Sequence, residues 1–285
     1  MRRLGVIANC TKPRAAEVLG RLGAKAEALG LELCAEGETA EVLRSGRRME
    51  PGEMVAHIEA LVALGGDGTV LRAVRELNGP DIPVLGVNIG GLGFLTSVAE
   101  QDLERALECL AKGDFTTGVR SVGQCRVSAA GQPLQYRALN DIVLTRGGPA
   151  RVVTLDLSID GEHISSVVCD GLIISTPTGS TGHSLSAGGP VVFPGAPVFV
   201  VTMICPHTLS TRPLVVPDRS VIVVRVTNSP GGMVLSVDGQ VGNPLSAGDE
   251  VEVTRSAQSV RFVHLPRYSY PSVLRQKLHW RGSNV

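Results

Sequence analysis

The sequence predicts an α/β domain followed by a β-rich domain, and three observations carry this prediction. In the first 114 residues, short apolar runs alternate with stretches whose apolar residues recur at helical spacing. From about residue 115, helical spacing is nearly absent, and short β-branched segments alternate with turn signals. The chain has 285 residues, which is enough for two ordinary domains. We therefore expect residues 1–114, completed by 267–285, to form the α/β domain and residues 115–266 the β-rich domain.

Composition narrows the class of protein further. The chain is 43% hydrophobic, which is too apolar for a disordered protein. Its 27 Lys and Arg residues balance 27 Asp and Glu residues, so no basic excess indicates a nucleic-acid or membrane partner. No apolar run approaches the roughly 18 residues of a membrane span.

The six cysteines are scattered, with no close pair at metal-ligand spacing. We interpret them as reduced thiols of a cytoplasmic protein and predict no metal site built by the chain. Cys10, Cys125 and Cys205 stand among apolar residues, and we expect all three to be buried.

Strands and helices alternate in the first domain. Gly30 fits the C-terminal end of the first helix. The polar residues 45–53 are expected to be exposed. Strand–helix alternation indicates a parallel sheet covered on both faces. The expected strands are 4–8, 31–35, 61–64 and 82–87, and the expected helices are 13–29, 38–43, a segment from the glycine loop to Leu77, and 100–110.

The second domain is predicted to be rich in antiparallel strands. Asp160-Gly161 and Asp238-Gly239 are turn signals between apolar segments. Residues 273–280 are expected to form a closing segment. The expected strands are 125–128, 141–144, 154–159, 172–175, 198–204, 220–226, 234–237 and 250–254.

The stretch LVALGGDGTVL, residues 61–71, carries the main functional signal. A buried strand enters a glycine loop that opens a helix, and phosphate binds well at such helix N-termini. A carboxylate at Asp67 would be repelled by phosphate unless a metal ion lies between them or Asp67 accepts a proton from an attacking hydroxyl. Gly66, Gly68 and Thr69 complete the loop. The alternative is a plain tight turn in which Asp67 caps the helix.

A second polar loop lies in the β-rich half. Between Ser175 and Ser186 there are seven hydroxyl side chains in twelve residues, including Ser180 and Thr181. Hydroxyls and glycine amides together suit a phosphorylated, polyhydroxylated ligand such as a nucleotide. The alternative is that these hydroxyls satisfy their own backbone. Asp170, just before the preceding strand, is a candidate for binding sugar hydroxyls.

Asn140-Asp141 precedes another apolar run. Asn140 offers a donor and an acceptor to a base edge or a ribose, although a turn residue at a strand start is an equally good interpretation.

Taken together, these strings resemble the NAD kinase family, in the right order and over most of the chain. The strings that carry the resemblance are GGDGT at 65–69, NIGGLGFL at 88–95, Asn140-Asp141, DGLIISTPTGST with SLSAGGP at 170–190, ICPHTLSTRPLVVP at 204–217 and VDGQ at 237–240. The serine/threonine loop and the CPHTL string are quite specific. GGDGT alone is shared with diacylglycerol, sphingosine and 6-phosphofructo kinases.

The resemblance implies ATP-dependent phosphorylation of the adenosine ribose 2′-hydroxyl of NAD, with Mg²⁺ or another divalent cation accompanying ATP. It implies a Rossmann-like N-terminal α/β domain, a β-sandwich-like C-terminal domain and a substrate cleft between them. It also implies a cytosolic homo-oligomer, either a homodimer or a homotetramer. The residues that it assigns are Asp67 as the catalytic aspartate, Gly68 and Phe94 as site-lining residues, Asn140 as an adenosine contact, and Asp170, Thr181 and Ser186 as NAD contacts.

Two positions depart from the family pattern. Asn140-Asp141 stands where the family usually has Asn-Glu, which shortens the carboxylate but keeps its charge. Thr181-Gly182-His183-Ser184 stands where the family usually has Thr-Ala-Tyr-Ser, so an imidazole replaces a phenol. Loss of the tyrosine removes an aromatic wall and a phenol from the implied substrate pocket, although imidazole can still stack and hydrogen-bond, so this change bears on the choice among NAD, NADH and analogues.

Two other functions are compatible with parts of the sequence. A lipid kinase of the diacylglycerol or sphingosine type would share the GGDGT loop, but it would need an apolar entry for an acyl chain. A non-catalytic nucleotide-binding sensor would keep the fold, but the intact Asp67 argues against it.

Overall fold

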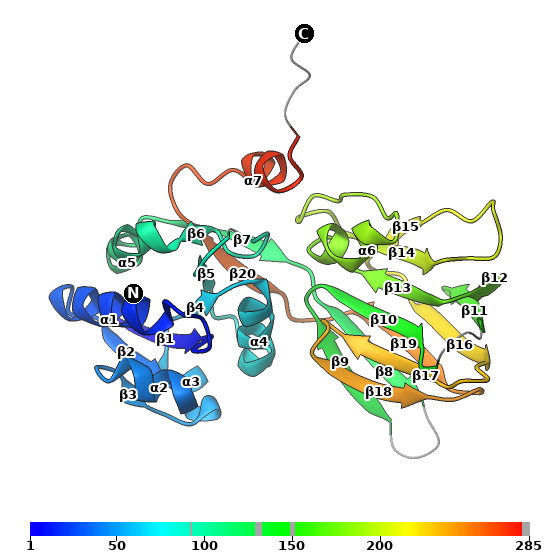
Figure 1. Ribbon diagram of the computed structural model, residues 1–285, viewed down its shortest axis with the longest axis horizontal. Coiled ribbons are helices and arrows are strands. Elements are labelled where there is room, and N and C mark those ends of the chain that lie inside the picture. Colours follow the sequence, from blue (N-terminus) through cyan, green and yellow to red (C-terminus); the bar gives the residue numbers. More distant parts are fainter. Residues whose placement is uncertain (92, 129–132, 149–151, 281–285) are drawn as a thin grey trace, which may run out of the picture. The chain divides into compact units, whose positions relative to one another are not determined.

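The computed structural model describes residues 1–91, 93–128, 133–148 and 152–280, and the chain divides into two compact units (Figure 1). Unit 1 comprises Met1–Val119 with Val260–Val285, and unit 2 comprises Arg120–Ser259. The sequence analysis places these boundaries at residues 115 and 267. Leu92 of the NIGGLGFL string lies outside the described residues.

Unit 1 is built on an eight-stranded sheet with the order β3-β2-β1-β4-β5-β20-β7, in which β6 also pairs with β5. The strands β1, β2, β4, β5 and β20 pair in parallel, as predicted from the alternation of strands and helices. The strands are β1 Arg3–Ala8, β2 Glu32–Ala35, β3 Arg47–Arg48, β4 Ala60–Gly65, β5 Val84–Asn88, β6 Val98–Ala99, β7 Thr116–Arg120 and β20 Val260–His264.

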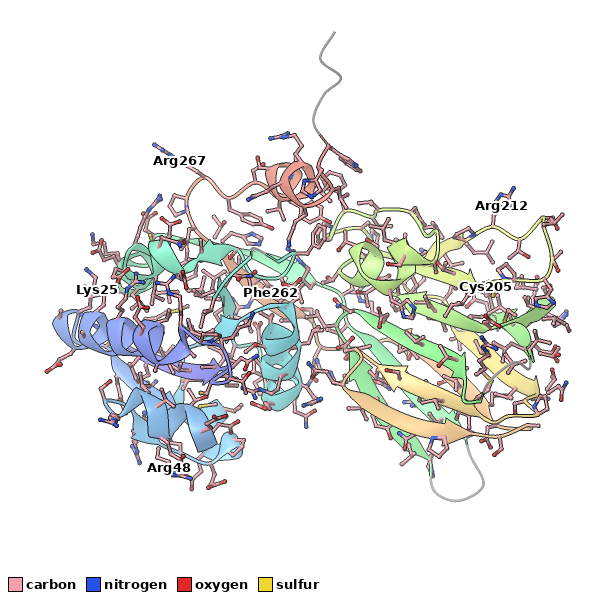
Figure 2. The ribbon with its side chains drawn as sticks, viewed as in Figure 1. Lys25, Arg48, Cys205, Arg212, Phe262 and Arg267 are labelled. Carbon is pink, nitrogen blue, oxygen red and sulfur yellow. The ribbon has the colours of Figure 1, made fainter. Side chains whose placement is uncertain are left out.

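Helices cover both faces of this sheet. The apolar sides of α1, α2 and α5 form one continuous core with the strands, while α3 and α4 pack against the sheet from the opposite face. Lys25 of α1 pairs with Glu108 of α5, which adds an ion pair at the edge of that core (Figure 2). The helices are α1 Ala15–Ala28, α2 Gly37–Leu43, α3 Pro51–His57, α4 Asp67–Leu77, the 3-10 turn η1 Glu100–Asp102, α5 Leu103–Lys112 and α7 Tyr270–Lys277.

Unit 2 is a sandwich of two six-stranded antiparallel sheets, with orders β15-β14-β13-β10-β17-β18 and β12-β11-β16-β19-β8-β9. Alternate residues of both sheets point inward and form one apolar core. The strands are β8 Gly123–Ser128, β9 Leu134–Ala138, β10 Asp141–Arg146, β11 Val153–Ile159, β12 Glu162–Cys169, β13 Gly171–Ser175, β14 Val198–Ile204, β15 Leu214–Pro217, β16 Ile222–Asn228, β17 Met233–Val237, β18 Val241–Leu245 and β19 Glu250–Arg255.

The two Asp-Gly turn predictions are confirmed. Asp160-Gly161 joins β11 to β12 with φ of 53° and 83°, and Asp238-Gly239 joins β17 to β18 with φ of 52° and 65°. Two successive positive φ angles match the twist of an antiparallel hairpin, and Asp and Gly tolerate them better than most residues do.

Some expectations are wrong. Residues 45–53 are not uniformly exposed, because Met49 is buried and α3 begins at Pro51. Cys125 is buried as expected, but Cys10 is only half-buried and Cys205 is exposed, since β14 ends at Ile204 and Cys205 turns away with φ of 45°. All six cysteines are free thiols. Within the described residues, no helix is long and apolar enough to cross a membrane.

Candidate active site

The glycine loop of unit 1 forms as the sequence predicts. β4 ends at Gly65, Gly66 is the extended residue before the helix, and Asp67 is the first residue of α4. The buried Thr69 closes the loop, since its Oγ1 lies 3.5 Å from the backbone nitrogen of Gly66. A Cβ built on Gly66 or Gly68 would meet no atom within 4 Å. The two glycines therefore leave open space at the positive end of the α4 dipole, which suits phosphate.

The carboxylate of Asp67 is fixed by the loop that follows β5. The backbone N–H of Phe94 donates to Oδ2 over 2.9 Å, and the N–H of Leu95 donates to Oδ1 over 3.0 Å. The interpretation of Asp67 as the helix cap is wrong, because Gly66 occupies that position and the carboxylate of Asp67 accepts from the loop after β5 instead. Phe94, a predicted site residue, thus meets Asp67 through its main chain.

Gly93 is required for this arrangement. A Cβ built on Gly93 would overlap Oδ1 of Asp67 and lie 2.5 Å from its Cγ. The backbone of Gly93 is held in turn by Thr96, whose Oγ1 accepts its N–H over 2.9 Å and also accepts from Nδ2 of the buried Asn88 over 3.0 Å. The glycine loop and residues 88–96 therefore form one hydrogen-bonded assembly around the Asp67 carboxylate.

Lys12 lies beside the same loop. Its ammonium nitrogen is 3.9 Å from the position that a Cβ on Gly90 would occupy. Lys12 follows β1, whose C-terminal end lies at the same edge of the parallel sheet as the end of β4. An ammonium group at this edge can compensate phosphate charge.

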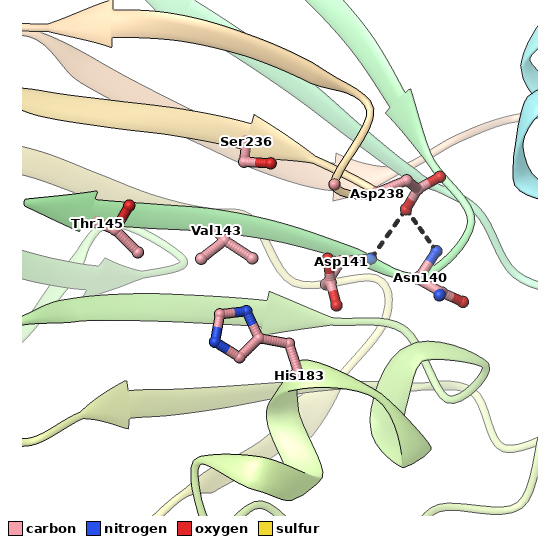
Figure 3. A pocket seen from close by; sticks show the side chains of 8 residues that line it. Asn140, Asp141, Val143, Thr145, His183, Ser236 and Asp238 are labelled. Carbon is pink, nitrogen blue, oxygen red and sulfur yellow. Dashed lines mark hydrogen bonds between the residues drawn. The ribbon is translucent and has the colours of Figure 1, made fainter. Parts of the chain in front are cut away.

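Unit 2 contains a pocket of about 290 Å³ on the outer face of one sheet (Figure 3). Strand alternation sends Ile142 and Leu144 of β10 into the core, so that Asp141, Val143 and Thr145 point outward. His183, the first residue of the short helix α6 (His183–Ser186), projects over this face. The lining residues are Asn140, Asp141, Val143, Thr145, His183, Ser236, Asp238 and Gly239.

Asp238 organises the start of β10. Its carboxylate accepts backbone N–H groups from three consecutive residues, Leu139, Asn140 and Asp141, at 2.9, 2.7 and 3.0 Å. The side chain of Asp141 is buried nearby. Burial, and secondarily the charge of Asp238, raise the pKa of Asp141 to about 7. The pocket is thus lined by two carboxyl groups, and the carboxyl group of Asp141 exchanges its proton near neutral pH.

Most hydroxyls of the serine/threonine loop bond to the protein itself. Ser180 is fully buried: its Oγ donates to the carbonyl of Pro177 over 2.7 Å and accepts the N–H of Val192 over 3.0 Å. Thr181 Oγ1 donates to the carbonyl of Thr178 over 3.4 Å, and Ser184 bonds to Thr202. These bonds support the alternative interpretation, in which these hydroxyls form hydrogen bonds within the protein and do not serve a ligand.

Other atoms near the loop are available to a ligand. Oδ1 of Asn140 and Oγ1 of Thr178 are buried without a partner among the described residues, and such buried polar atoms need an explanation. Gly182, His183 and Ser186 are exposed. The loop also contains two short helices, the 3-10 turn η2 (Gly179–Thr181) and α6, which the sequence analysis did not foresee.

Asp170 does not join this pocket. It lies before β13, at the end of that strand opposite to the serine/threonine loop, and forms an ion pair of 3.4 Å with Arg146. Unit 2 therefore brings Asn140, Asp141 and His183 together but places Asp170 elsewhere in the same sheet.

Three residues of these sites were missed by the sequence analysis. Gly93 and Asp238 lie within the quoted strings NIGGLGFL and VDGQ, so their positions were signalled but their contacts were not. Lys12 carries no local signal, because it reaches Gly90 only through the packing of β1 beside β4.

Comparison with known proteins covers both units. Residues 4–115 match the ATP-NAD kinase N-terminal domain, and residues 139–265 match the ATP-NAD kinase C-terminal domain. An NAD kinase of Gemmatimonas aurantiaca is 43% identical over 282 residues, covering 98% of this chain and 96% of that protein. An NAD kinase of Syntrophotalea carbinolica is 38% identical, covering 98% and 99%.

Two solved structures share the fold. Yeast NADH kinase complexed with NADH has a TM-score of 0.92 and 27% identity, covering 99% of this chain and 89% of that chain. An NAD kinase from Archaeoglobus fulgidus in complex with ATP has a TM-score of 0.76 and 26% identity, covering 98% and 100%. The glycine loop alone would also be compatible with a lipid kinase, whereas these matches to NAD kinases extend through both units. The chain belongs to the ATP-NAD kinase family.

Proposed function

We propose that this protein is an NAD kinase, which transfers the γ-phosphate of ATP to the 2′-hydroxyl of the adenosine ribose of NAD and releases NADP and ADP. The observation that carries the proposal is the fixed carboxylate of Asp67 at the N-terminus of α4, beside a bare glycine backbone. Family membership supports the choice of donor and acceptor.

Unit 1 handles the phosphate groups. Phosphate oxygens occupy the open space beside Gly66 and Gly68 at the positive end of the α4 dipole, and Lys12 compensates their charge. Mg²⁺ enters with ATP as part of the substrate, and the hard oxygen atoms of Asp67 are of the type that it binds. Phosphoryl transfer depends mainly on such positioning and charge stabilisation.

Asp67 acts on the hydroxyl that attacks. A carboxylate has about four lone-pair positions, and among the described residues each oxygen of Asp67 accepts one backbone N–H, so an O–H donor can still bind. The ribose oxygen forms a bond to the γ-phosphorus as the bond to the leaving ADP oxygen breaks. The hydroxyl proton passes to Asp67 and then to solvent.

Unit 2 recognises the dinucleotide. Asn140 offers its buried, unpartnered Oδ1, and Asp141 and His183 line the same pocket. Gly182 and Ser186 are exposed beside His183, whereas the hydroxyls of Ser180 and Thr181 mainly hold the loop in shape. Asp170 lies outside this pocket, at the far end of β13, where it pairs with Arg146. We also propose a cytoplasmic homodimer or homotetramer.

The test is an NADP-formation assay with purified protein, NAD, ATP and Mg²⁺, run beside the Asp67→Asn variant. We expect NADP from the wild type and a loss of about 10²- to 10⁴-fold in kcat in the variant, the usual range for a general base. A loss of less than about threefold would remove Asp67 from this role. No NADP from the wild type would overturn the proposal, and a panel of other nucleosides, lipids and polyphosphate would then be assayed.

A further inference from the structure

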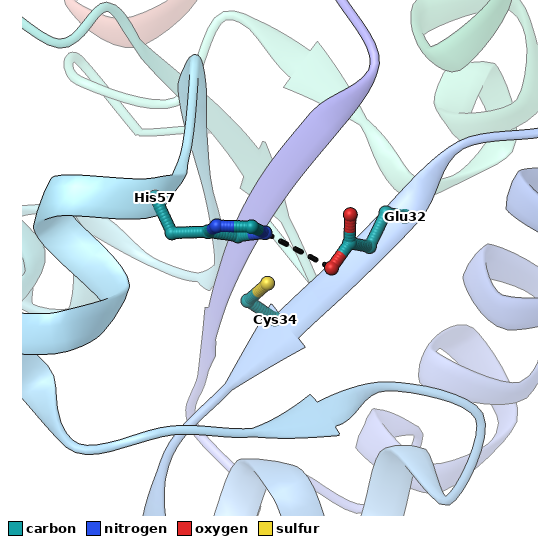
Figure 4. A group of neighbouring side chains, drawn as sticks. All are labelled: Glu32, Cys34 and His57. Carbon is teal, nitrogen blue, oxygen red and sulfur yellow. Dashed lines mark hydrogen bonds and ion pairs between the residues drawn. The ribbon is translucent and has the colours of Figure 1, made fainter.

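A second group of chemically reactive side chains lies in unit 1, in the strand β2 and at the end of α3. Glu32 and Cys34 are two residues apart on β2, so they point to the same face of the sheet. Leu33 between them belongs to the core under α1, α2 and α5, so Glu32 and Cys34 face the side covered by α3. His57, the last residue of α3, reaches over both of them (Figure 4).

The three side chains converge closely. Nε2 of His57 lies 2.9 Å from Oε1 of Glu32, and Sγ of Cys34 lies beneath this pair. One ligand atom from each residue lies within 4.8 Å of the other two. Small side-chain rotations from this arrangement would let all three atoms share one cation, since zinc–ligand bonds are about 2.0–2.3 Å long.

The donor set indicates the kind of cation. A thiolate, an imidazole nitrogen and a carboxylate oxygen together suit Zn²⁺ and similar transition-metal ions, whereas Mg²⁺ prefers oxygen alone. Cys34 is fully buried, while the side chains of His57 and Glu32 are 26% and 44% exposed. The buried sulfur would form the base of the site, and the exposed side would admit a cation and a water ligand.

Charged neighbours have opposing effects. Burial, and after it the charge of Glu32, raise the pKa of the Cys34 thiol, whereas Arg47 and Arg3 act in the opposite direction but would repel an incoming cation. The carboxylate of Glu32 also acts on Cys34 and attracts the cation. Glu32 is therefore needed both as a ligand and as a counter-charge.

We propose that Glu32, Cys34 and His57 bind one zinc-like divalent cation, with water as the fourth ligand. The cation would tie β2 to the end of α3. Because β4 begins only three residues after His57 and leads directly to the glycine loop, this bond would brace the strand that presents Asp67. No metal site is predicted from the sequence, because its cysteines are not closely spaced and Cys34 meets His57 only in the fold.

Cobalt is the probe that tests this proposal. Metal-free, reduced protein is titrated with Co²⁺ in the absence of nucleotide. We expect a thiolate-to-cobalt charge-transfer absorption that saturates at one cation per chain, disappears on adding Zn²⁺ and persists in excess Mg²⁺. Cys34→Ser should abolish the band. Cys205→Ser is the matched control, because it removes an exposed cysteine in unit 2 and should leave the band intact.

A second variant keeps the test decisive if Cys34→Ser does not fold. His57→Gln keeps a hydrogen-bond donor for Glu32 but loses the imidazole nitrogen. It should fold like the wild type by circular dichroism, yet bind Zn²⁺ at least about 100-fold more weakly, since even loss of an outer-shell partner costs about 10- to 100-fold. Zn²⁺ should raise the Tm of the wild type but not that of His57→Gln. Absence of the band in the wild type, or a band and Tm response that survive both substitutions, would overturn the proposal.

Discussion

The backbone N–H of Phe94 lies 2.9 Å from Oδ2 of Asp67 and donates a hydrogen bond to it. Together with the bond from Leu95 to Oδ1, this contact joins the glycine loop after β4 to the loop after β5. The carboxylate is therefore oriented before any substrate arrives. Such preorganisation matters for phosphoryl transfer, since most of the rate enhancement comes from correct placement.

Gly93→Ala tests this orientation without removing the carboxylate. The new methyl group would overlap Oδ1 of Asp67 and force the side chain or the loop to move. We expect kcat for NADP formation to fall about 100-fold, the scale of loss for a misplacement of roughly 1 Å. Gly20→Ala is the control, since a Cβ on Gly20 in α1 meets no atom within 4 Å. Equal kcat values for the two variants would show that the position of Asp67 is not critical.

Asp238→Asn should destabilise unit 2. The substitution leaves one amide oxygen in place of two carboxylate oxygens that accept three backbone N–H groups. We expect a loss of roughly 1.5–3 kcal/mol in the free energy of unfolding, the usual worth of a hydrogen bond to a charged group. Denaturation at about pH 5 is the measurement, because Asp141, with a pKa of about 7, is then protonated and its repulsion of Asp238 is absent.

Asp160→Asn is the matched control for that experiment. Asp160 occupies the same position of an Asp-Gly turn with nearly the same φ, but within the described part of the chain its carboxylate accepts one N–H, that of Val221. An asparagine oxygen can replace that single acceptor. Similar losses in the two variants would mean that the turn itself, and not the three-fold acceptor role of Asp238, sets the cost.

Asp141 should make stability fall as the pH rises. Its pKa is raised from 3.8 to about 7 in the folded protein, chiefly by burial, so between these values the folded state holds a proton that the unfolded chain releases. The stability that this group contributes is therefore complete below about pH 3.8 and is lost as the pH rises through about 7. In urea denaturation from pH 4 to 8, the free energy of unfolding of Asp141→Asn should rise relative to that of the wild type by up to roughly 1.4 kcal/mol per pH unit. Parallel profiles would contradict this.

His183→Tyr should alter substrate recognition more than folding. The side chain is exposed and projects over the pocket that contains Asn140 and Asp141, so replacing the imidazole by a phenol changes the ligand surface and not the core. We expect Tm to stay constant while KM for NAD and the preference between NAD and NADH change. Unchanged KM and preference, measured in the same buffer, would remove His183 from the recognition surface.

Local sequence signals predicted the parts of the fold that depend on neighbours in the chain. The run Leu61–Leu64, the glycines after it and the helical spacing to Leu77 were sufficient for β4, the loop and α4. Both Asp-Gly turns were equally readable. The strand β12 was missed because most of its residues are exposed, and β20 because its place between β5 and β7 follows from contacts across the whole chain.

In the candidate site too, contacts between residues far apart in the sequence could not be predicted. Asp67 was recognisable from its loop, but its contacts with Phe94 and Leu95 connect residues far apart in sequence. The serine/threonine loop was recognisable as polar, but the use of Ser180 and Thr181 as backbone supports depends on the way the loop folds over Pro177 and Thr178. Residue type indicated the chemistry, and only the packing showed which atoms remain available for it.

The position of β20 has a consequence for biosynthesis. This strand, Val260–His264, inserts between β5 and β7 of unit 1, although its residues leave the ribosome after all of unit 2. Unit 2 can thus fold during translation from contiguous sequence, while the part of β5 that pairs with β20 stays open until β20 itself has been translated. Premature termination before Val260 would leave this part of β5 without its partner strand. The shortened product would then aggregate or be degraded by proteases, and it would not persist as a half-active enzyme.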